Sequence, residues 1–304
     1  MITTRMYKNG DYEKIMTFLK EMYHLNKNQH CWLPAKWEYT EHLVNPLYIE
    51  RGYASWEDYI RIWEEEDKIV AIAHIEDTCN VFLQVRPGYS HLELEMVQWA
   101  EDNCAIPVEN SENKKIIIWA KESEEHLKEL LTEQGYKKWH DCNYMNVQSL
   151  DGEYEPKLSE GYVIRSMAED IDLCKRYNVI RKAFHPEAEY ETTIPNCILK
   201  MISAPMYRTD LDIVAEYKDG SLAAACIVWY DEQNKIGMFE PVGTHPDHGR
   251  KGLGKAILLE GLKRLKKLGA THAYVESYGE ERYAFYSSAG FKVYDKDYPW
   301  VKTI

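Results

Sequence analysis

A glycine-rich turn between an apolar stretch and a basic helix restricts the fold of this chain more than any other feature. The apolar stretch 236–244 predicts a strand. Leucines then recur on one helical face, so a helix is predicted over 251–268, closed by Gly269. Three glycines fall between the strand and the body of the helix, at 249, 252 and 254. Glycines let the backbone approach a ligand closely, and the free amides at a helix start bind phosphate.

The charge of this segment opposes that of the chain. Residues 250–268 contain seven basic side chains and one acid, Glu260, within a chain of net charge −13. The acidic balance argues against nucleic acid or an anionic membrane as a general partner. The local basic cluster predicts a small polyanion beside the glycine turn. The alternative is a solvated helix face that binds nothing.

The two halves of the chain repeat one order of elements. Residues 151–161 are polar, contain two glycines and a proline, and predict a linker. After it, strands alternate with helices and antiparallel hairpins, with helices predicted over 168–184, 195–202 and 280–289. The first half is a blurred copy, with helices over 11–26, 55–63, 90–103 and 123–134. The predicted fold is α/β of the mixed α+β kind, in two domains, 1–150 and 151–304.

Two nucleotide-binding motifs fit the glycine turn poorly. Gly249 and Gly254-Lys255 match a P-loop, but Ala256 stands where Ser or Thr must hold Mg²⁺. A dinucleotide fingerprint would need Gly or Ala at Ile257.

A third pattern fits better. Thr244-x-Pro246-x-x-Gly249-x-x-Gly252-x-Gly254 resembles the acyl-CoA pyrophosphate loop of the GNAT superfamily of N-acetyltransferases, although Gly249 replaces the usual Arg or Gln. Downstream, Tyr286-Ser-Ser-Ala-Gly290-Phe291 resembles the Tyr-x-x-x-Gly-Phe signature of the same superfamily. Gly279 stands where Asn is often found.

The resemblance implies an acetyl-CoA-dependent N-acetyltransferase built from two tandem GNAT-like domains, each a mixed, mostly antiparallel sheet flanked by helices. The acceptor would be a primary amine of a small molecule or peptide. The alternative is a CoA-binding regulatory or interaction module without turnover. The expected CoA-binding residues are Val242, Gly243, Thr244, Gly249, Arg250, Lys251, Gly252, Leu253, Gly254 and Lys255.

Direct acyl transfer needs a base, oxyanion donors and an acid. By resemblance, Tyr286 is the acid, with a packed helix tyrosine as the alternative. Backbone amides of 242–244 are the expected donors, because the strand should part from its neighbour there. Glu240, in an apolar strand, is the first candidate base and Glu276 the second. His245 and His248 flank the loop, and a loop histidine is more often simply solvated.

The first half departs from the pattern. Glu93 and Glu95 occupy the positions of the two key glycines, and their charges would repel a pyrophosphate, so this copy is expected to bind no CoA. Its many Tyr and Trp residues around 29–63 suit a cationic amine, or ordinary packing.

The cysteine pattern and the lack of an evident targeting segment predict the cellular location. The seven cysteines form no C-x-x-C, and no secretory or transmembrane segment is evident, which predicts reduced thiols and a cytoplasmic location. No metal site and no nucleic-acid or membrane partner is expected, and the oligomeric state is left open.

Overall fold

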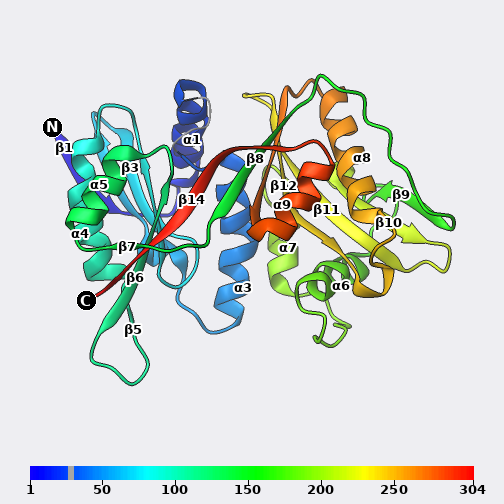
Figure 1. Cartoon of the computed structure of the whole chain (residues 1–304), viewed down its shortest axis with the longest axis horizontal. Helices are drawn as coiled ribbons and strands as arrows, with labels where there is room; N and C mark the ends of the chain where they lie inside the picture. The colour runs from blue at the N-terminus through cyan, green and yellow to red at the C-terminus, as the bar shows by residue number, and fades with distance from the viewer. Residues whose placement is uncertain (27–30) are drawn as a thin grey trace. The chain divides into compact units, whose positions relative to one another are not determined.

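The computed structural model describes residues 1–26 and 31–304 and divides them into two compact units (Figure 1). Unit 1 comprises Met1–Tyr144 together with Asp295–Ile304, and unit 2 comprises Met145–Tyr294. This division differs from the predicted domains 1–150 and 151–304, because the last ten residues pack with the first half. The boundary of the repeat itself stays a prediction.

Unit 1 is a mixed sheet whose central strands are buried. The order is β1-β2-β3-β4-β6-β14, antiparallel except for the parallel pair β4–β6. The strands are β1 (Ile2–Met6), β2 (Arg61–Glu65), β3 (Lys68–Ile75), β4 (Asn80–Val85), β6 (Lys114–Lys121) and β14 (Lys292–Thr303). The two-residue strands β5 (Ile106–Pro107) and β7 (Lys137–Lys138) pair with β6 and β14.

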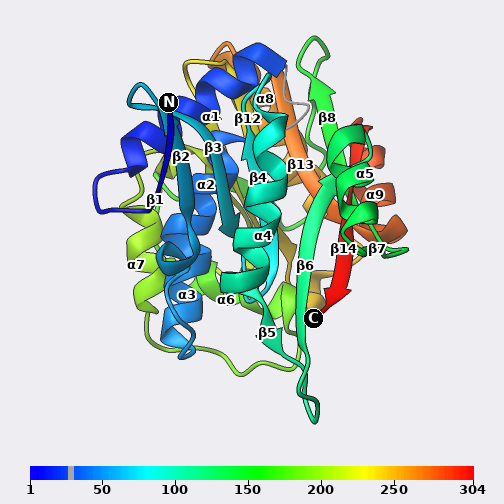
Figure 2. The same cartoon turned by 90° about the vertical axis from the view of Figure 1, so that its left-hand side faces the viewer.

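Helices cover both faces of this sheet. Figure 2 shows α4 (Glu93–Cys104) and α5 (Glu125–Glu133) in front of the strands, with α1 (Tyr12–Asn26) and α2 (Pro34–Tyr39) behind them. A π-helical turn over Thr40–Val44 links α2 to α3 (Asn45–Glu50). Short 3-10 turns occupy Trp56–Tyr59 and Ser90–Leu92.

Unit 2 has the same arrangement. Its order is β9-β10-β11-β12-β13-β8, with antiparallel pairs from β9 to β12 and a parallel pair β12–β13. The strands are β8 (Asn143–Ser149), β9 (Tyr162–Ser166), β10 (Asp212–Tyr217), β11 (Leu222–Asp231), β12 (Ile236–Thr244) and β13 (His272–Tyr278). The helices are α6 (Leu173–Phe184), α7 (Asn196–Ile202), α8 (Leu253–Lys267) and α9 (Gly279–Ser288), with 3-10 turns at Thr209–Leu211 and Pro246–His248.

Each half of the chain lends its last strand to the other unit. By sequence, β8 ends the first half, yet it lies beside β13 in unit 2. By the same logic β14 ends the second half, and its residues Asp297–Thr303 pair with β6 in unit 1. The two units therefore have matching sheets that are completed by exchanged strands.

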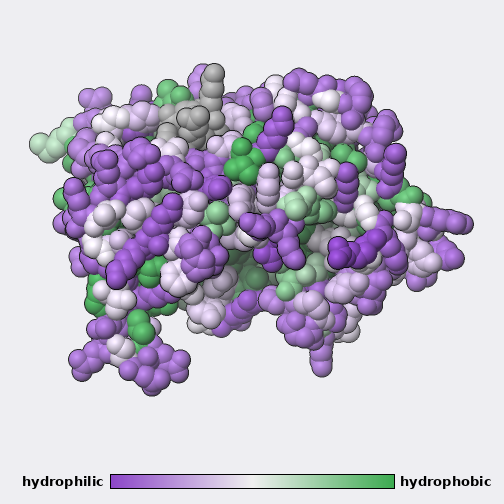
Figure 3. Space-filling model, viewed as in Figure 1, coloured by the Kyte–Doolittle hydropathy of each residue, from purple (hydrophilic) through white to green (hydrophobic). Residues whose placement is uncertain are grey.

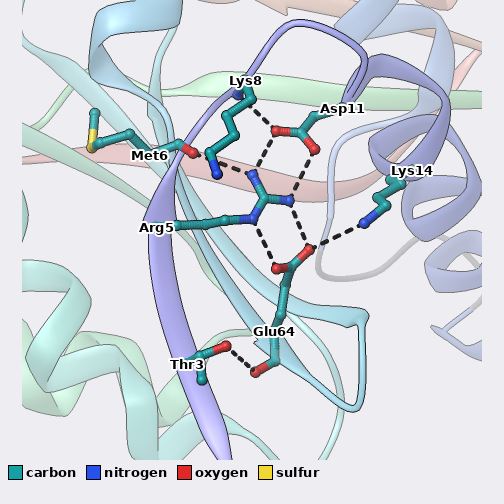
Figure 4. A network of polar contacts seen from close by, with 7 residues as sticks. All are labelled: Thr3, Arg5, Met6, Lys8, Asp11, Lys14 and Glu64. Carbon is teal, nitrogen blue, oxygen red and sulfur yellow. Dashed lines mark hydrogen bonds and ion pairs between the residues drawn. The ribbon is translucent and has the colours of Figure 1, made fainter.

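An arginine network occurs at the same place in both units. Arg5, the fourth residue of β1, donates to both carboxylate oxygens of Asp11 and of Glu64, at 2.6–2.9 Å (Figure 4). Arg165, the fourth residue of β9, donates to Glu216 and lies 3.8 Å from Asp170. In each unit the glutamate pairs with the residue two before the arginine. The recurrence supports a duplicated fold.

Three predicted elements are wrong. The helix over 55–63 is instead the Trp56–Tyr59 turn followed by β2, where Ile62 and Trp63 are buried between two strands. The helix over 168–184 begins only at Leu173, because the Asp172 side chain caps it by accepting from Lys175 N–H. The helix over 90–103 begins as a 3-10 turn over Ser90–Leu92 and becomes α-helical only at Glu93. The helices α2 and α3 were not predicted.

The chain surface and its cysteines are unexceptional. Hydrophilic residues predominate on the face drawn in Figure 3. All seven cysteines are free, and five of them are buried. Among residues 1–26 and 31–304, no helix has the length and apolar character that a bilayer crossing requires.

A buried histidine lies at the centre of the aromatic core of unit 1. His74 on β3 is inaccessible, and its ring makes edge contacts with Trp32 and Trp37 at centroid distances of 4.4 and 4.9 Å. Nδ1 lies 3.1 Å from the carbonyl of Ile75, so it carries the proton, and Nε2 accepts from Gln84 at 2.9 Å. Burial lowers the pKa of His74 from 6.5 to about 3.

This histidine predicts an acid-sensitive unit 1. The unfolded chain binds a proton at His74 below pH 6.5 and the folded chain does not, so folded-state stability falls as the pH falls. Relative to a His74→Leu variant, the wild type should lose about 1.4 kcal/mol for each pH unit below 6.5. Denaturant unfolding followed by tryptophan fluorescence measures both proteins between pH 5 and 7.5. Parallel pH profiles would contradict the assignment.

Candidate functional site

The site is organised by a strand that leaves its neighbour. β12 pairs in parallel with β13 only from Ile236–His272 to Met238–Tyr274. Beyond that point β12 continues to Thr244 and β13 continues to Tyr278, but the two strands no longer pair with each other. On the other side β12 stays paired with β11, with a bulge that places Glu240 and the cis-linked Pro241 opposite Ile227. The two strands therefore part after Met238, and the residues 242–244, where a parting was expected, lie in the unpaired segment.

The parted segment leaves backbone groups free to bind a ligand. Alternate residues of a strand direct their amides to opposite sides. The amides of 239–244 that point away from β11 therefore face the opening. Val242, Gly243 and Thr244, the expected donors, lie in this segment. Gly243 also fits α6 closely, since a Cβ there would lie 2.8 Å from the Cβ of Ala183.

The loop after β12 ends in exposed helix amides. Arg250 and Gly252 both have left-handed backbone, with φ of 62° and 75°. The first bond of α8 runs from Ala256 N–H to Gly252 C=O, so the amides of Leu253, Gly254 and Lys255 have no acceptor within the helix. This is the geometry at which helices bind phosphate.

The loop glycines differ in purpose. A Cβ at Gly252 would meet nothing within 4 Å, so the space above it is open. A Cβ at Gly254 would lie 3.1 Å from both Phe285 and Thr244, so this glycine is needed for packing against α9. A Cβ at Gly249 would lie 3.2 Å from the carbonyl of Pro246. The positive φ of Gly252 itself favours glycine, and the open space above it leaves room for a ligand to approach the backbone.

The basic residues of the loop are not equivalent. Arg250 and Lys255 are exposed. Lys251 Nζ donates to the hydroxyl of Tyr162 at 3.0 Å, and that hydroxyl lies 2.8 Å from Nδ1 of His248. Because Lys251 is only a donor, the Tyr162 proton points to Nδ1. Burial and the nearby charges of Lys251 and His245 lower the pKa of His248, which is therefore neutral. Its accepting nitrogen is already occupied, which disfavours His248 as a base.

Tyr162 was not among the residues singled out from the sequence. It contacts the loop from β9, 86 residues before His248 and 89 before Lys251. No local signal marks such a partner, because 23 tyrosines are spread along the chain.

Tyr286 and Glu240 act on each other. Tyr286 on α9 is 9% exposed and packs against Phe291 and Phe285. Burial raises the pKa of Tyr286 strongly, and the charge of Glu240 raises it further. Tyr286 therefore keeps its proton well above neutral pH. Glu240 is half-buried in the splayed segment, with its Oε2 atom shielded from solvent. Glu276 is half-buried on β13, two residues beyond Tyr274, the last residue of β13 that pairs with β12.

A pocket of about 390 Å³ adjoins the loop on the α6 side. His245, Asp247 and His248 line it from the loop. The remaining lining includes Tyr190 and, from the hairpin between β10 and β11, Asp219.

Unit 1 has the same parting of strands but a closed loop. β4 pairs with β6 only at Asn80–Ile117 and Val81–Ile118. At the start of the following helix α4, Glu93 is buried and accepts from His126 at 2.6 Å. Glu95 accepts from the indole of Trp63 at 3.0 Å. The start of α4 therefore bears two carboxylates, which bond to the side chains of His126 and Trp63, where unit 2 has open amides.

Two rival chemistries gain no support. Ala256 is 1% exposed in the core, so its position offers nothing to a nucleotide-bound Mg²⁺. No group of three or more His, Cys, Asp or Glu side chains is arranged to hold a metal within 1–26 and 31–304.

Sequence comparisons give one family model and two relatives. Residues 211–293 match the acetyltransferase (GNAT) domain. A mycothiol acetyltransferase of Actinosynnema mirum is 28% identical over 188 residues, which cover 60% of this chain and 62% of that protein. A second one, of Nocardiopsis dassonvillei, is 27% identical over 156 residues, covering 48% and 47%. The chain thus spans less than two thirds of the length of these relatives.

Solved structures match the fold along the whole chain. A GCN5-related N-acetyltransferase of Sphaerobacter thermophilus covers 99% of this chain and 95% of its own, with a TM-score of 0.66 at 16% identity. A tandem GNAT protein from the clavulanic acid biosynthesis pathway covers 100% and 98%, with a TM-score of 0.62 at 12% identity. At such identities these matches show the fold alone. Residues 211–293 therefore carry an acetyltransferase (GNAT) domain, and the whole chain has the fold of a tandem GNAT protein.

Proposed function

We propose that the chain transfers an acetyl group from acetyl-CoA to a primary amine of a small molecule or peptide, using unit 2. The observation that carries the proposal is the opening between β12 and β13, which leads to the free amides at the start of α8. A pyrophosphate on those amides would place the pantetheine arm along the opening. The acyl-CoA donor is what the acetyltransferase (GNAT) domain implies.

In this proposal the amine nitrogen attacks the thioester carbonyl, and the C–S bond then breaks. Amides of 242–244 that face the opening stabilise the oxyanion. Glu240 takes the proton that the amine loses, with Glu276 as the second candidate. Tyr286 gives its proton to the departing CoA sulfur; burial and Glu240 raise the pKa of this phenol, so the proton is in place when the C–S bond breaks. The products are the acetylated amine and free CoA thiol.

We further propose that the acceptor enters by the pocket beside His245. Two carboxylates, Asp219 and Asp247, line this pocket with one lysine, Lys175, which favours a cationic amine.

The bare backbone at Gly252 gives a binding test with a matched control. Gly252 and Gly269 bracket α8, both have positive φ, and a Cβ on either meets nothing within 4 Å. Alanine at either position should therefore cost a similar stability, about 1 kcal/mol. Only Gly252→Ala should weaken acetyl-CoA binding, by about tenfold or more, the equivalent of about 1.4 kcal/mol. Calorimetric titration of both variants measures this, and equal affinities would refute the phosphate role of the loop.

The two side-chain roles are tested by turnover. Tyr286→Phe and Glu240→Gln should each lower kcat by about a hundredfold while leaving acetyl-CoA affinity unchanged. The controls are Tyr283→Phe and Glu281→Gln, which make the same changes on α9. Thiol release from acetyl-CoA across a panel of amines is the assay. In the wild type, Tyr286 should cause no alkaline decline in rate up to about pH 10.

Two results would count against these assignments. Unchanged rates in both variants would refute the roles given to Tyr286 and Glu240. Tight acetyl-CoA binding with no thiol release for any amine would refute turnover and favour a CoA-binding module.

A further inference from the structure

Unit 1 contains a second pocket, of about 380 Å³, that plays no part in the proposed reaction. Its walls come from α3, the segment 53–59, the turn after β3 and the short strand β5. It lies at the amino end of β4, whereas the closed loop with Glu93 follows the carboxyl end. The six residues of β4 separate the two by roughly 17 Å. The pocket is therefore distinct from the position that corresponds to the CoA loop.

The lining of this pocket is aromatic and acidic. Four aromatic side chains line it, Tyr48, Tyr53, Trp56 and Tyr59, together with the carboxylates of Glu76 and Asp77. No lysine or arginine is among the lining residues that the structure describes. Aromatic faces and carboxylates both attract a cation, and they reinforce each other when water is partly excluded.

The negative charges of the two carboxylates have different partners. Glu76 forms an ion pair with Lys36 at 2.8 Å, and Lys36 is itself buried. Asp77 accepts from the hydroxyl of Tyr48 at 3.3 Å and from the amide of Asn80, both of which are neutral. Within the described part of the chain, the hydrogen bonds of Asp77 thus bring no positive charge. Burial and the charge of Asp77 raise the pKa of Tyr48 to about 12, so Tyr48 stays neutral and protonated.

The aromatic groups of the pocket are held at different depths. Trp56 is almost fully buried at the base, where its ring packs on Trp37 at 4.7 Å between centroids. Tyr48 and Tyr53 pack against each other, with ring centroids 5.2 Å apart and planes inclined by 52°. Tyr53 is 53% exposed, so it stands at the rim. Rigid core packing fixes the base, and the rim remains accessible to a small molecule.

We propose that this pocket binds a small organic ammonium ion, with its charge against Asp77 and its substituents against the four aromatic rings. The site is independent of the acetyl transfer proposed for unit 2. A pocket of this size holds a small metabolite and not a polymer segment. Neither the domain match, which covers 211–293, nor the structural matches assign a ligand here.

Three probes separate charge from apolar contact. They are choline, ethanolamine and 3,3-dimethylbutan-1-ol, the last being the neutral carbon analogue of choline. Calorimetric titration of the full chain should show choline or ethanolamine binding about tenfold tighter than the neutral analogue. A preference for choline over ethanolamine would mark a quaternary ammonium ligand, and the reverse would mark a primary one.

Variants locate the binding. Asp77→Asn should weaken cation binding by about tenfold, and Tyr53→Leu, at the exposed rim, by about threefold. Asp58→Asn is the matched control, because Asp58 is an exposed acid of the same segment that does not line the pocket. It should leave affinity unchanged. Circular dichroism and acetyl-CoA affinity confirm that each variant is folded.

Several outcomes would overturn the proposal. Equal affinities for choline and its neutral analogue would show an apolar cleft without cation recognition. An equal loss in Asp58→Asn and Asp77→Asn would show only the general acidity of unit 1. If neither Asp77→Asn nor Tyr53→Leu alters cation binding, the cation binds outside this pocket. No binding of either cation up to about 10 mM would exclude the site.

Discussion

The parting of two parallel strands is the constraint on which the rest of unit 2 depends. After Met238 and Tyr274, β12 and β13 no longer share hydrogen bonds, yet both continue for several residues. Such a gap is tolerated only where another group can satisfy the free backbone. The close fit of Gly243 to α6 and of Gly254 to α9 holds the surrounding helices in place. The opening is therefore built into the fold, and we propose that acetyl-CoA fills it.

Comparison of the units shows what a duplicated fold keeps and what it loses. Both keep the arginine network of the first strand and the parallel pair that parts early. They differ at the start of the helix that follows. In unit 2 the first amides of α8 are open, while in unit 1 Glu93 is buried there and bonded to His126. The side-chain bonds of Glu93 to His126 and of Glu95 to Trp63 hold two carboxylates at that helix start.

Local sequence patterns predicted the elements of the candidate site better than they predicted which distant segments pair as strands. The strand, glycine turn and helix of 236–268 were predicted because apolar periodicity and glycine spacing are local signals. A parting of the strands was expected at 242–244, and the structure has β12 leave β13 after Met238. The helix predicted over 55–63 was wrong because Ile62 and Trp63 are buried by pairing with strands far away in sequence.

Other features had no local signal at all. The exchange of β8 and β14 could not be predicted, since either strand has a pattern that suits either sheet. Likewise Lys251 was expected to face phosphate, whereas its recorded partner is Tyr162 on β9. The pairing of Tyr162 with His248 then decides which nitrogen of that histidine is free.

The central claim is that one repeat has an open loop for acetyl-CoA and the other has closed it with its own carboxylates. Hydrogen exchange of the full chain with and without acetyl-CoA tests this most directly, because it reports both loops in one experiment. The account predicts new protection of amides in 242–255 and none in 86–97. Protection of both loops, or of the unit 1 loop alone, would contradict it.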